Sequence, residues 1–334
     1  MNANERKNVL TRRELLKVGG FAAAALAGSA AWLGRPAAAA ALHDPAENAR
    51  KRVLRFAHLT DIHLQPERRA PEGLTACLRH VQSQPDKPEL ILTGGDTIMD
   101  SMASDEARVK LQWELWQKVI KQECSLPIES CLGNHDVWGL NKEKSKTTGS
   151  EPLFGTRWAM QVFGIDSPYR SFDRAGWHFI ALDGVFPEGN GYQGRLDEEQ
   201  FAWLAEDLKA VPPATPVLIW SHIPVLSAAA YFGGKNEETN DWVVSRSVMH
   251  IDARRFKDLF LKHPNVKLFL SGHLHLVDRV DYLGVSYVCG GAVSGAWWKG
   301  AHYECEPGYT LVNLYDDGTF EHEYVTYGWK AAEK

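Results

Sequence analysis

The sequence predicts an α/β protein, and three observations carry that prediction. Short apolar runs rich in branched residues recur along the chain, helical patterns lie between them, and nearly every run ends in a small block of polar residues. Apolar runs of this length are typical of strands buried on both faces, and their alternation with helices indicates an α/β architecture. In such folds, functional groups collect in the loops beyond the carboxyl ends of the strands.

The elements follow in order from these patterns. Buried strands are predicted at residues 53–59, 90–93, 127–132, 217–220 and 266–270. Helices are predicted at residues 105–121, 197–210 and 252–263, and segments 169–183, 277–293 and 309–327 are predicted to form antiparallel strands and hairpins. Trp113 and Trp116 share one face of the first predicted helix, which places them in the core.

The composition allows a sizeable core and excludes several classes of protein. Of the 334 residues, 44% are hydrophobic and 24% are charged, which is typical of a globular protein and not of a disordered chain, a collagen or a multi-span membrane protein. The formal net charge of −5 argues against a protein that holds nucleic acid mainly by phosphate neutralisation. We expect one large domain over residues 53–330, after a polar linker at 42–52.

Residues 1–41 are predicted to be an export signal. Five basic residues, among them Arg12 and Arg13, precede the uncharged run 18–34, and several small-residue cleavage sites follow that run. The paired arginines resemble a twin-arginine motif, which implies export of a folded chain by the twin-arginine machinery to the periplasm or another extracytoplasmic place. A retained anchor is the alternative. Removal of the signal takes the formal net charge from −5 to about −9.

The polar blocks at the strand ends contain the residue types that bind metal ions. They are Asp61-Ile62-His63, Gly94-Gly95-Asp96, Gly133-Asn134-His135-Asp136, Ser221-His222 and Gly272-His273-Leu274-His275. Each block alone is a weak signal, since a lone Asp-x-His is usually a turn. The third and fifth blocks together would arise by chance in about two of ten thousand chains of this composition.

The chemistry of these donors favours two divalent ions. Four imidazoles and three oxygen donors suit iron, manganese or zinc rather than calcium, and the absence of thiolates argues against structural zinc. The seven donors are Asp61, His63, Asp96, Asn134, His222, His273 and His275. Seven are too many for one tetrahedral ion but suffice for two if a carboxylate bridges them, and Asp96, in a glycine-flanked turn, is the natural bridge.

The order of the blocks resembles the calcineurin-like metallophosphoesterases, whose pattern is D-x-H, G-D, G-N-H-D/E, H and G-H-x-H. The match spans Asp61 to His275. The resemblance implies a four-layer α/β/β/α sandwich of two mixed sheets with a dinuclear metal site at the carboxyl ends of the strands. It also implies hydrolysis of a phosphoric ester by attack of a metal-bridging hydroxide.

The resemblance also implies a role for each residue. One ion would take Asp61, His63, Asp96 and His275, and the other would take Asp96, Asn134, His222 and His273. His135 would not bind metal but would contact the substrate phosphate and serve as general acid or charge stabiliser. Asp136 would orient His135, as a carboxylate commonly fixes an imidazole.

Departures from relatives narrow the substrate class. Purple acid phosphatases have a tyrosine where this chain has Met99, and protein phosphatases have two phosphate-clamping arginines that are missing here, where Val137 and Trp138 follow Asp136. With these two classes excluded, the pattern of this chain resembles the phosphodiesterase branch of the family, which includes cyclic-nucleotide and glycerophosphodiester enzymes. We therefore expect a small phosphodiester as substrate and no stable nucleic acid partner. A phosphomonoesterase or nuclease on the same core, or a non-catalytic metal-binding protein, are the alternatives.

Other features remain open from sequence alone. Cys124 with Cys131, or Cys289 with Cys305, are possible disulfides, although sequence cannot establish their geometry. Segment 223–248 is either a lid or a surface loop. Trp297-Trp298-Lys299 offers rings that stack on a base or sugar, but packing is the favoured interpretation. Histidines outside the blocks are expected to be structural: His58, His178, His250, His302 and His322.

Overall fold

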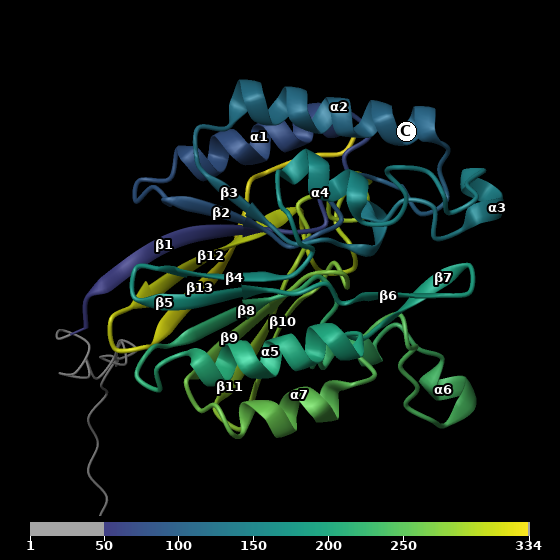
Figure 1. Ribbon diagram of the computed structural model, residues 1–334. Coiled ribbons are helices and arrows are strands. Elements are labelled where there is room, and N and C mark those ends of the chain that lie inside the picture. The colour runs from purple at the N-terminus through teal and green to yellow at the C-terminus, as the bar shows by residue number, and fades with distance from the viewer. Residues whose placement is uncertain (1–49, 333–334) are drawn as a thin grey trace, which may run out of the picture. The chain divides into compact units, whose positions relative to one another are not determined.

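The structure is a computed structural model that describes residues 50–332 (Figure 1). The predicted signal at 1–41 and most of the linker at 42–52 lie outside the described residues. The helices are α1 (Ala70–Gln82), α2 (Glu106–Glu123), α3 (Lys142–Ser145), α4 (Arg157–Phe163), α5 (Glu198–Ala210), α6 (Asn236–Thr239) and α7 (Ala253–Phe260). Two short 3-10 helices, η3 (Asn134–Asp136) and η4 (Ala229–Tyr231), complete the helical elements.

Two large mixed sheets form the centre of the fold. The five-stranded sheet has the order β13-β12-β1-β2-β3 and contains β1 (Arg52–Leu59), β2 (Leu90–Thr93), β3 (Ile128–Ser130), β12 (Gly308–Tyr315) and β13 (Phe320–Thr326). The six-stranded sheet has the order β10-β11-β9-β8-β5-β4 and contains β4 (Arg170–Arg174), β5 (Trp177–Ala181), β8 (Val217–Trp220), β9 (Val266–Ser271), β10 (Val277–Tyr282) and β11 (Val285–Gly290). A separate hairpin joins β6 (Val185–Glu188) to β7 (Gly191–Gly194).

The strand directions agree with the sequence pattern. The strands that precede polar blocks pair in parallel, β1 with β2, β2 with β3, and β8 with β9. The three segments predicted as antiparallel form the pairs β4–β5, β10–β11 and β12–β13. The predicted α/β class, with two mixed sheets, is confirmed.

Three apolar cores separate four layers, with α1 and α2 above one sheet and α5 and α7 below the other (Figure 1). One core joins α1 and α2 to the five-stranded sheet and includes the predicted core residues Trp113 and Trp116. A second joins α5 and α7 to the six-stranded sheet. The third lies between the sheets and includes Phe56, Phe179 and Trp220. Strands buried on both faces explain why their sequences are apolar throughout.

Local signals explain where two of the helices begin, and the sequence analysis missed α1, α3, α4 and α6. Asp105 and Asp197 cap α2 and α5, each accepting a hydrogen bond from a backbone N–H of the first turn. Helix α1 was not predicted, although its buried residues recur at helical spacing: Ala70, Gly73, Leu74, Cys77, Leu78 and Val81. A Cβ at Gly73 would lie 2.1 Å from the Trp298 ring, so the glycine admits that indole against the helix. Among residues 50–332, no helix is long and apolar enough to span a bilayer.

Candidate metal centre

The polar loops after β1, β2, β3, β8 and β9 meet at one edge of the two sheets. Backbone hydrogen bonds fasten them to one another: Asp61 N donates to Gly95 O at 3.1 Å, His63 N to Asp96 O at 2.9 Å, and Gly272 N to His222 O at 2.9 Å. The carboxyl ends of parallel strands lie at the same edge of a sheet, which is why blocks far apart in sequence come together.

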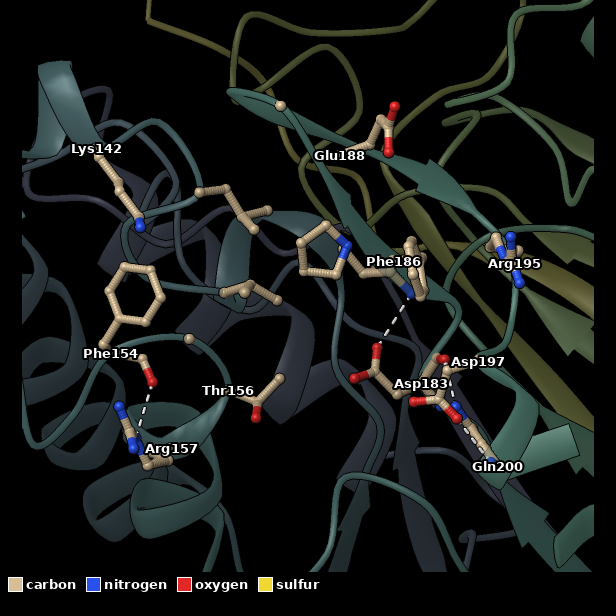
Figure 2. Close-up of a pocket in the computed structure, with 16 residues that line it drawn as sticks. Lys142, Phe154, Thr156, Arg157, Asp183, Phe186, Glu188, Arg195, Asp197 and Gln200 are labelled. Atoms are coloured by element: carbon tan, nitrogen blue, oxygen red, sulfur yellow. Dashed lines mark hydrogen bonds between the residues drawn. The ribbon is translucent and has the colours of Figure 1, made fainter. Parts of the chain in front are cut away.

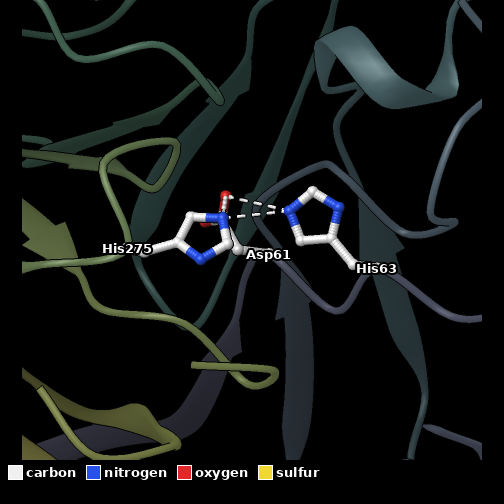
Figure 3. Close-up of side chains that lie close together, drawn as sticks. All are labelled: Asp61, His63 and His275. Atoms are coloured by element: carbon white, nitrogen blue, oxygen red, sulfur yellow. Dashed lines mark hydrogen bonds and ion pairs between the residues drawn. The ribbon is translucent and has the colours of Figure 1, made fainter. Parts of the chain in front are cut away.

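The first candidate metal group consists of Asp61, His63 and His275 (Figure 3). The Nε2 atoms of His63 and His275 lie 3.0 Å apart. Both nitrogens face Asp61 Oδ1, at 3.8 Å from His63 and 3.2 Å from His275. Two imidazole nitrogens that converge on a carboxylate in a buried place form a set of donors directed at one point.

The second candidate group consists of Asp96, His222 and His273, and Asp96 connects it to the first. Asp96 Oδ2 lies 3.1 Å from His222 Nε2 and 3.6 Å from His63 Nε2. His273 Nδ1 lies 3.2 Å from His222 Nε2. One carboxylate oxygen therefore faces imidazoles of both groups, which is the position a bridging ligand requires.

A buried oxygen without a partner supports the fit of a metal ion. Asn134 Oδ1 is buried and accepts no hydrogen bond, although its amide nitrogen contacts Met102 Sδ at 3.8 Å. A buried acceptor without a donor is costly, whereas a cation would satisfy it. The mixed nitrogen and oxygen donors fit divalent iron, manganese or zinc. The structure thus brings all seven predicted ligands to one place.

The imidazole nitrogens that face away from the centre are held by backbone carbonyls. His222 Nδ1 donates to Gly94 O at 2.8 Å, His273 Nε2 to Ser247 O at 2.8 Å, and His275 Nδ1 to Gly295 O at 2.5 Å. Such bonds fix the tautomer and the ring orientation of metal-binding histidines. His63 differs, because its Nδ1 is buried and has no partner.

The electrostatics of the centre divides the histidines into two pairs. Burial lowers the pKa values of His63 and His273 to about 4, so both are neutral and carry a free lone pair. Burial also disfavours charge on His222 and His275, but the nearby aspartates outweigh it and raise both pKa values. These two histidines would release their protons when cations bind, because a metal takes the neutral imidazole.

Five of the seven predicted ligands have a left-handed backbone. The φ angles are 54° at Asp61, 48° at His63, 52° at Asp96, 71° at His273 and 57° at His275. Asp and His tolerate this region better than most residues, but each instance still costs free energy and persists only where surrounding contacts impose it. The turns therefore present the side chains inward at a conformational cost, as is common at functional sites.

His135 and Asp136 lie in η3, and the structure corrects the predicted relation between them. His135 Nδ1 donates to Met99 O, not to Asp136. Asp136 is fully buried and accepts backbone N–H groups instead, from Thr97 at 2.9 Å, from Ile98 at 3.3 Å and from Gly133 at 2.9 Å. The prediction that Asp136 orients the ring of His135 is wrong in this structure, because backbone donors of two loops occupy the carboxylate.

Exposure separates His135 from His63, His222 and His275, whereas His273 is also partly exposed. Its side chain is 21% exposed, against 1% for His63, 0% for His222 and 3% for His275. Its Nε2 lies 4.0 Å from Asp96 Oδ2, close enough for His63, Asp96 and His135 to form a third possible metal group. The side chain thus stands at the open side of the cluster.

Two cavities flank the centre. One, of about 700 Å³, lies between residues 137–157 and the β6–β7 hairpin, and its cations already have partners (Figure 2). Arg157 donates to Phe154 O and Glu151 O, and Arg195 donates to Leu196 O and Glu198. The other, of about 640 Å³, includes His273 in its wall. The second cavity is therefore the one that opens directly onto a predicted ligand.

The expectations for the cysteines, the other histidines and the tryptophan pair have different outcomes. All five cysteines are unpaired thiols, so neither possible disulfide forms. His178 and His250 are structural, each hydrogen-bonded to a carboxylate. His302 instead lines the second cavity, as does much of segment 229–248. The tryptophan pair splits: Trp298 is 1% exposed and packs in the core, whereas Trp297 lines that cavity.

The fold and the imidazole–carboxylate cluster define a two-sheet α/β protein with a candidate centre for two metal ions. Residues 54–277 match the calcineurin-like phosphoesterase family, and the chain belongs to that family. The family uses dinuclear metal centres, which agrees with the two candidate groups joined at Asp96.

Two proteins named as phosphodiesterases are similar to this chain in sequence. A 3′,5′-cyclic-nucleotide phosphodiesterase of Nostoc sp. is 32% identical over 162 residues, which cover 47% of this chain and 55% of the relative. A "Probable glycerophosphodiester phosphodiesterase" of Arcobacter nitrofigilis is 26% identical over 62% of this chain and 64% of the relative. The chain thus spans between half and two thirds of these two proteins.

Solved structures share the fold at low identity. A dimetal phosphatase from Danio rerio has a TM-score of 0.54 at 16% identity, covering 83% of this chain and 100% of its own. GAP50, described as the anchor in the inner membrane complex of Plasmodium, has a TM-score of 0.52 at 16% identity, covering 83% of this chain and 86% of its own. These likenesses concern the fold alone.

Proposed function

We propose that this chain is an exported phosphodiesterase that acts with two divalent ions, of iron, manganese or zinc. The observation that carries the proposal is Asp96 Oδ2, 3.1 Å from His222 and 3.6 Å from His63, between the two candidate metal groups. Export rests on the paired Arg12 and Arg13 ahead of an uncharged run, and the expected place of action is the periplasm or its equivalent.

Two bound ions would supply a nucleophile from water at neutral pH and neutralise the oxygens of the phosphoryl group. Asp61, His63, Asp96 and His275 would hold one ion, and Asp96, Asn134, His222 and His273 the other. Backbone carbonyls behind His222, His273 and His275 keep three of the four rings in place. The residues therefore provide a rigid frame in which little has to move during the reaction.

In this proposal, His135 would act on the leaving group. Its Nδ1–H is directed at Met99 O, which leaves Nε2 to carry the proton that can be donated to a leaving oxygen. The 21% exposure of its side chain gives a substrate access that His63 and His222 do not offer. A protonated His135 also adds positive charge beside the phosphate.

The charge near the centre favours a diester over a monoester. Among the residues that line the cavity beside His273, Lys235 is the one lysine or arginine, and it lies on an exposed loop. A monoester dianion carries more charge than a diester, and bidentate arginine contacts are the usual way to hold it. The acidic chain, at about −9 without the signal, also repels a dianion more strongly.

The test compares bis(p-nitrophenyl) phosphate with p-nitrophenyl phosphate on metal-loaded enzyme. We expect the larger kcat/KM for the diester. His135→Ala should retain its metal and lose turnover by a factor of roughly 100 to 10,000, the usual range for a general acid. The matched variant His263→Ala, on the surface beyond α7, should retain both. A monoester kcat/KM above that of every diester tried would overturn the substrate class, and loss of metal in His135→Ala would overturn the role of that residue.

A further inference from the structure

An aromatic wall begins directly at the candidate metal ligands. The Trp297 ring lies 4.4 Å from the His275 ring at an angle of 35°, and 5.9 Å from the His63 ring. The same indole lines the cavity of about 640 Å³ that includes His273. A flat apolar surface thus leads from the metal centre into a cavity of the size that small ligands occupy.

The loop that carries this wall is held in an unusual conformation. Trp297 and Trp298 have φ angles of 51° and 68°, and Tyr303 has 47°, a region that bulky residues rarely adopt. Trp298 N donates to Ser294 O at 2.7 Å, and the buried Trp298 indole donates to His63 O at 3.0 Å. These contacts fix Trp298 in the core and thereby set Trp297 at the cavity. Backbone strain of this kind is common at functional sites.

The rest of the cavity combines aromatic and neutral polar groups with one cation, Lys235, and one carboxylate, Asp241. His302 lies 5.5 Å from the Trp297 ring at 85°, and the ring of Tyr303, whose side chain is largely exposed, lies 4.6 Å from His302 at 70°. The exposed ring of Phe232 and the amide of Asn236 line the cavity from segment 229–248. Aromatic surfaces with hydrogen-bonding groups around them suit a flat heterocycle.

The geometry points to a binding site for a nucleobase, with Trp297 as its stacking platform and the scissile phosphate at the metal centre. This inference rests on the proposed phosphodiesterase activity and names its substrate class as nucleotide diesters. A glycerol group has no flat face to stack on Trp297. A quaternary ammonium group also suits aromatic cages, so a choline diester is the competing substrate in the test.

The test uses two diesters with the same leaving group, the p-nitrophenyl ester of thymidine 5′-monophosphate and methyl p-nitrophenyl phosphate. Wild-type enzyme should favour the thymidine ester, mainly through a lower KM. Trp297→Ala should lower kcat/KM for that ester by about 10- to 100-fold and change the methyl ester by less than about threefold. Trp297→Phe should restore most of the loss, and Trp242→Ala, an exposed tryptophan outside this lining, should behave as wild type.

Binding gives a readout independent of catalysis. Adenosine, which carries no phosphate, should show saturation transfer to its base protons with wild-type protein and a weakened signal with Trp297→Ala. Tyr303→Ala should weaken it too, which covers the case that Trp297→Ala disturbs His275. Equal loss on both esters, no adenosine signal, or a preference for glycerophosphocholine that depends on Trp297 would each overturn the base site. If metal-loaded wild type hydrolyses neither ester, the proposed activity itself fails.

Discussion

Replacement of Asp136 by asparagine tests whether this carboxylate joins two loops or serves His135. The carboxylate accepts N–H groups of Thr97 and Ile98 on Oδ1 and of Gly133 on Oδ2. Asparagine has one oxygen and one NH2 group in place of the two carboxylate oxygens. In either orientation of the amide, at least one buried backbone N–H therefore faces the NH2 group and loses its acceptor. Asp136→Asn should therefore loosen the contact between the loop that carries Asp96 and the loop that carries Asn134.

The expected cost follows from these bonds. A hydrogen bond to a charged group contributes about 1.5–3 kcal/mol, and an unsatisfied buried donor costs about 1–3 kcal/mol. Burial and the charge of Asp96 raise the pKa of Asp136 to about 7, so the carboxylate is not fully ionised without metal, which lowers the cost. We expect a loss of about 2–4 kcal/mol in the free energy of unfolding, and a 10- to 100-fold loss in metal affinity.

Urea unfolding in chelator and metal titration measure the two effects. Asp100→Asn is the matched control, since it is the same change in a nearby, more exposed carboxylate that accepts from Ala103 N and Ser104 Oγ. It should cost about 1 kcal/mol or less. If Asp136→Asn changes unfolding by less than about 0.5 kcal/mol while shifting the pH–rate profile as His135→Ala does, the carboxylate acts through His135 and our reasoning is wrong.

Three further outcomes are expected. Asp96→Asn should lower the occupancy of both metal sites together in elemental analysis, and loss of a single ion would contradict its bridging position. Burial disfavours charge on His178, but hydrogen bonds to Asp207 and Asp173 raise its pKa. The stability it contributes should be present below about pH 6.5 and lost as pH rises through the raised value, so His178→Gln should flatten that part of the stability profile. Replacing Arg12 and Arg13 by lysines should abolish export while keeping charge, and continued export by the unfolded-chain route would refute the twin-arginine assignment.

The sequence predicts the convergence of these donor side chains because its signal is local. Each donor follows a strand by two to four residues, and a parallel sheet brings such positions to one edge whatever the loop lengths are. The same reasoning places His135 beside the ligands. For this reason the seven donors and the fold class could be read without coordinates.

Other features depend on contacts between distant segments, which no local pattern encodes. The carbonyls of Gly94, Ser247 and Gly295 that hold the histidines come from three separate loops and carry no side-chain signature. The role of Asp136 depends on the backbone of a loop almost forty residues upstream. The split of Trp297 from Trp298 depends on left-handed φ angles, which sequence suggests at glycine but not at tryptophan.

The origin of the ligands in both sheets has a mechanical consequence. Each predicted site draws donors from loops of the five-stranded sheet, such as Asp61 and Asp96, and from loops of the six-stranded sheet, such as His222 and His275. Apart from the apolar core between the sheets, bound ions would be the strongest link between the two halves of the sandwich at this edge. Metal binding would then hold the two sheets together at this edge. Amide hydrogen exchange would slow at the carboxyl ends of strands in both sheets at once, far beyond the residues that touch an ion.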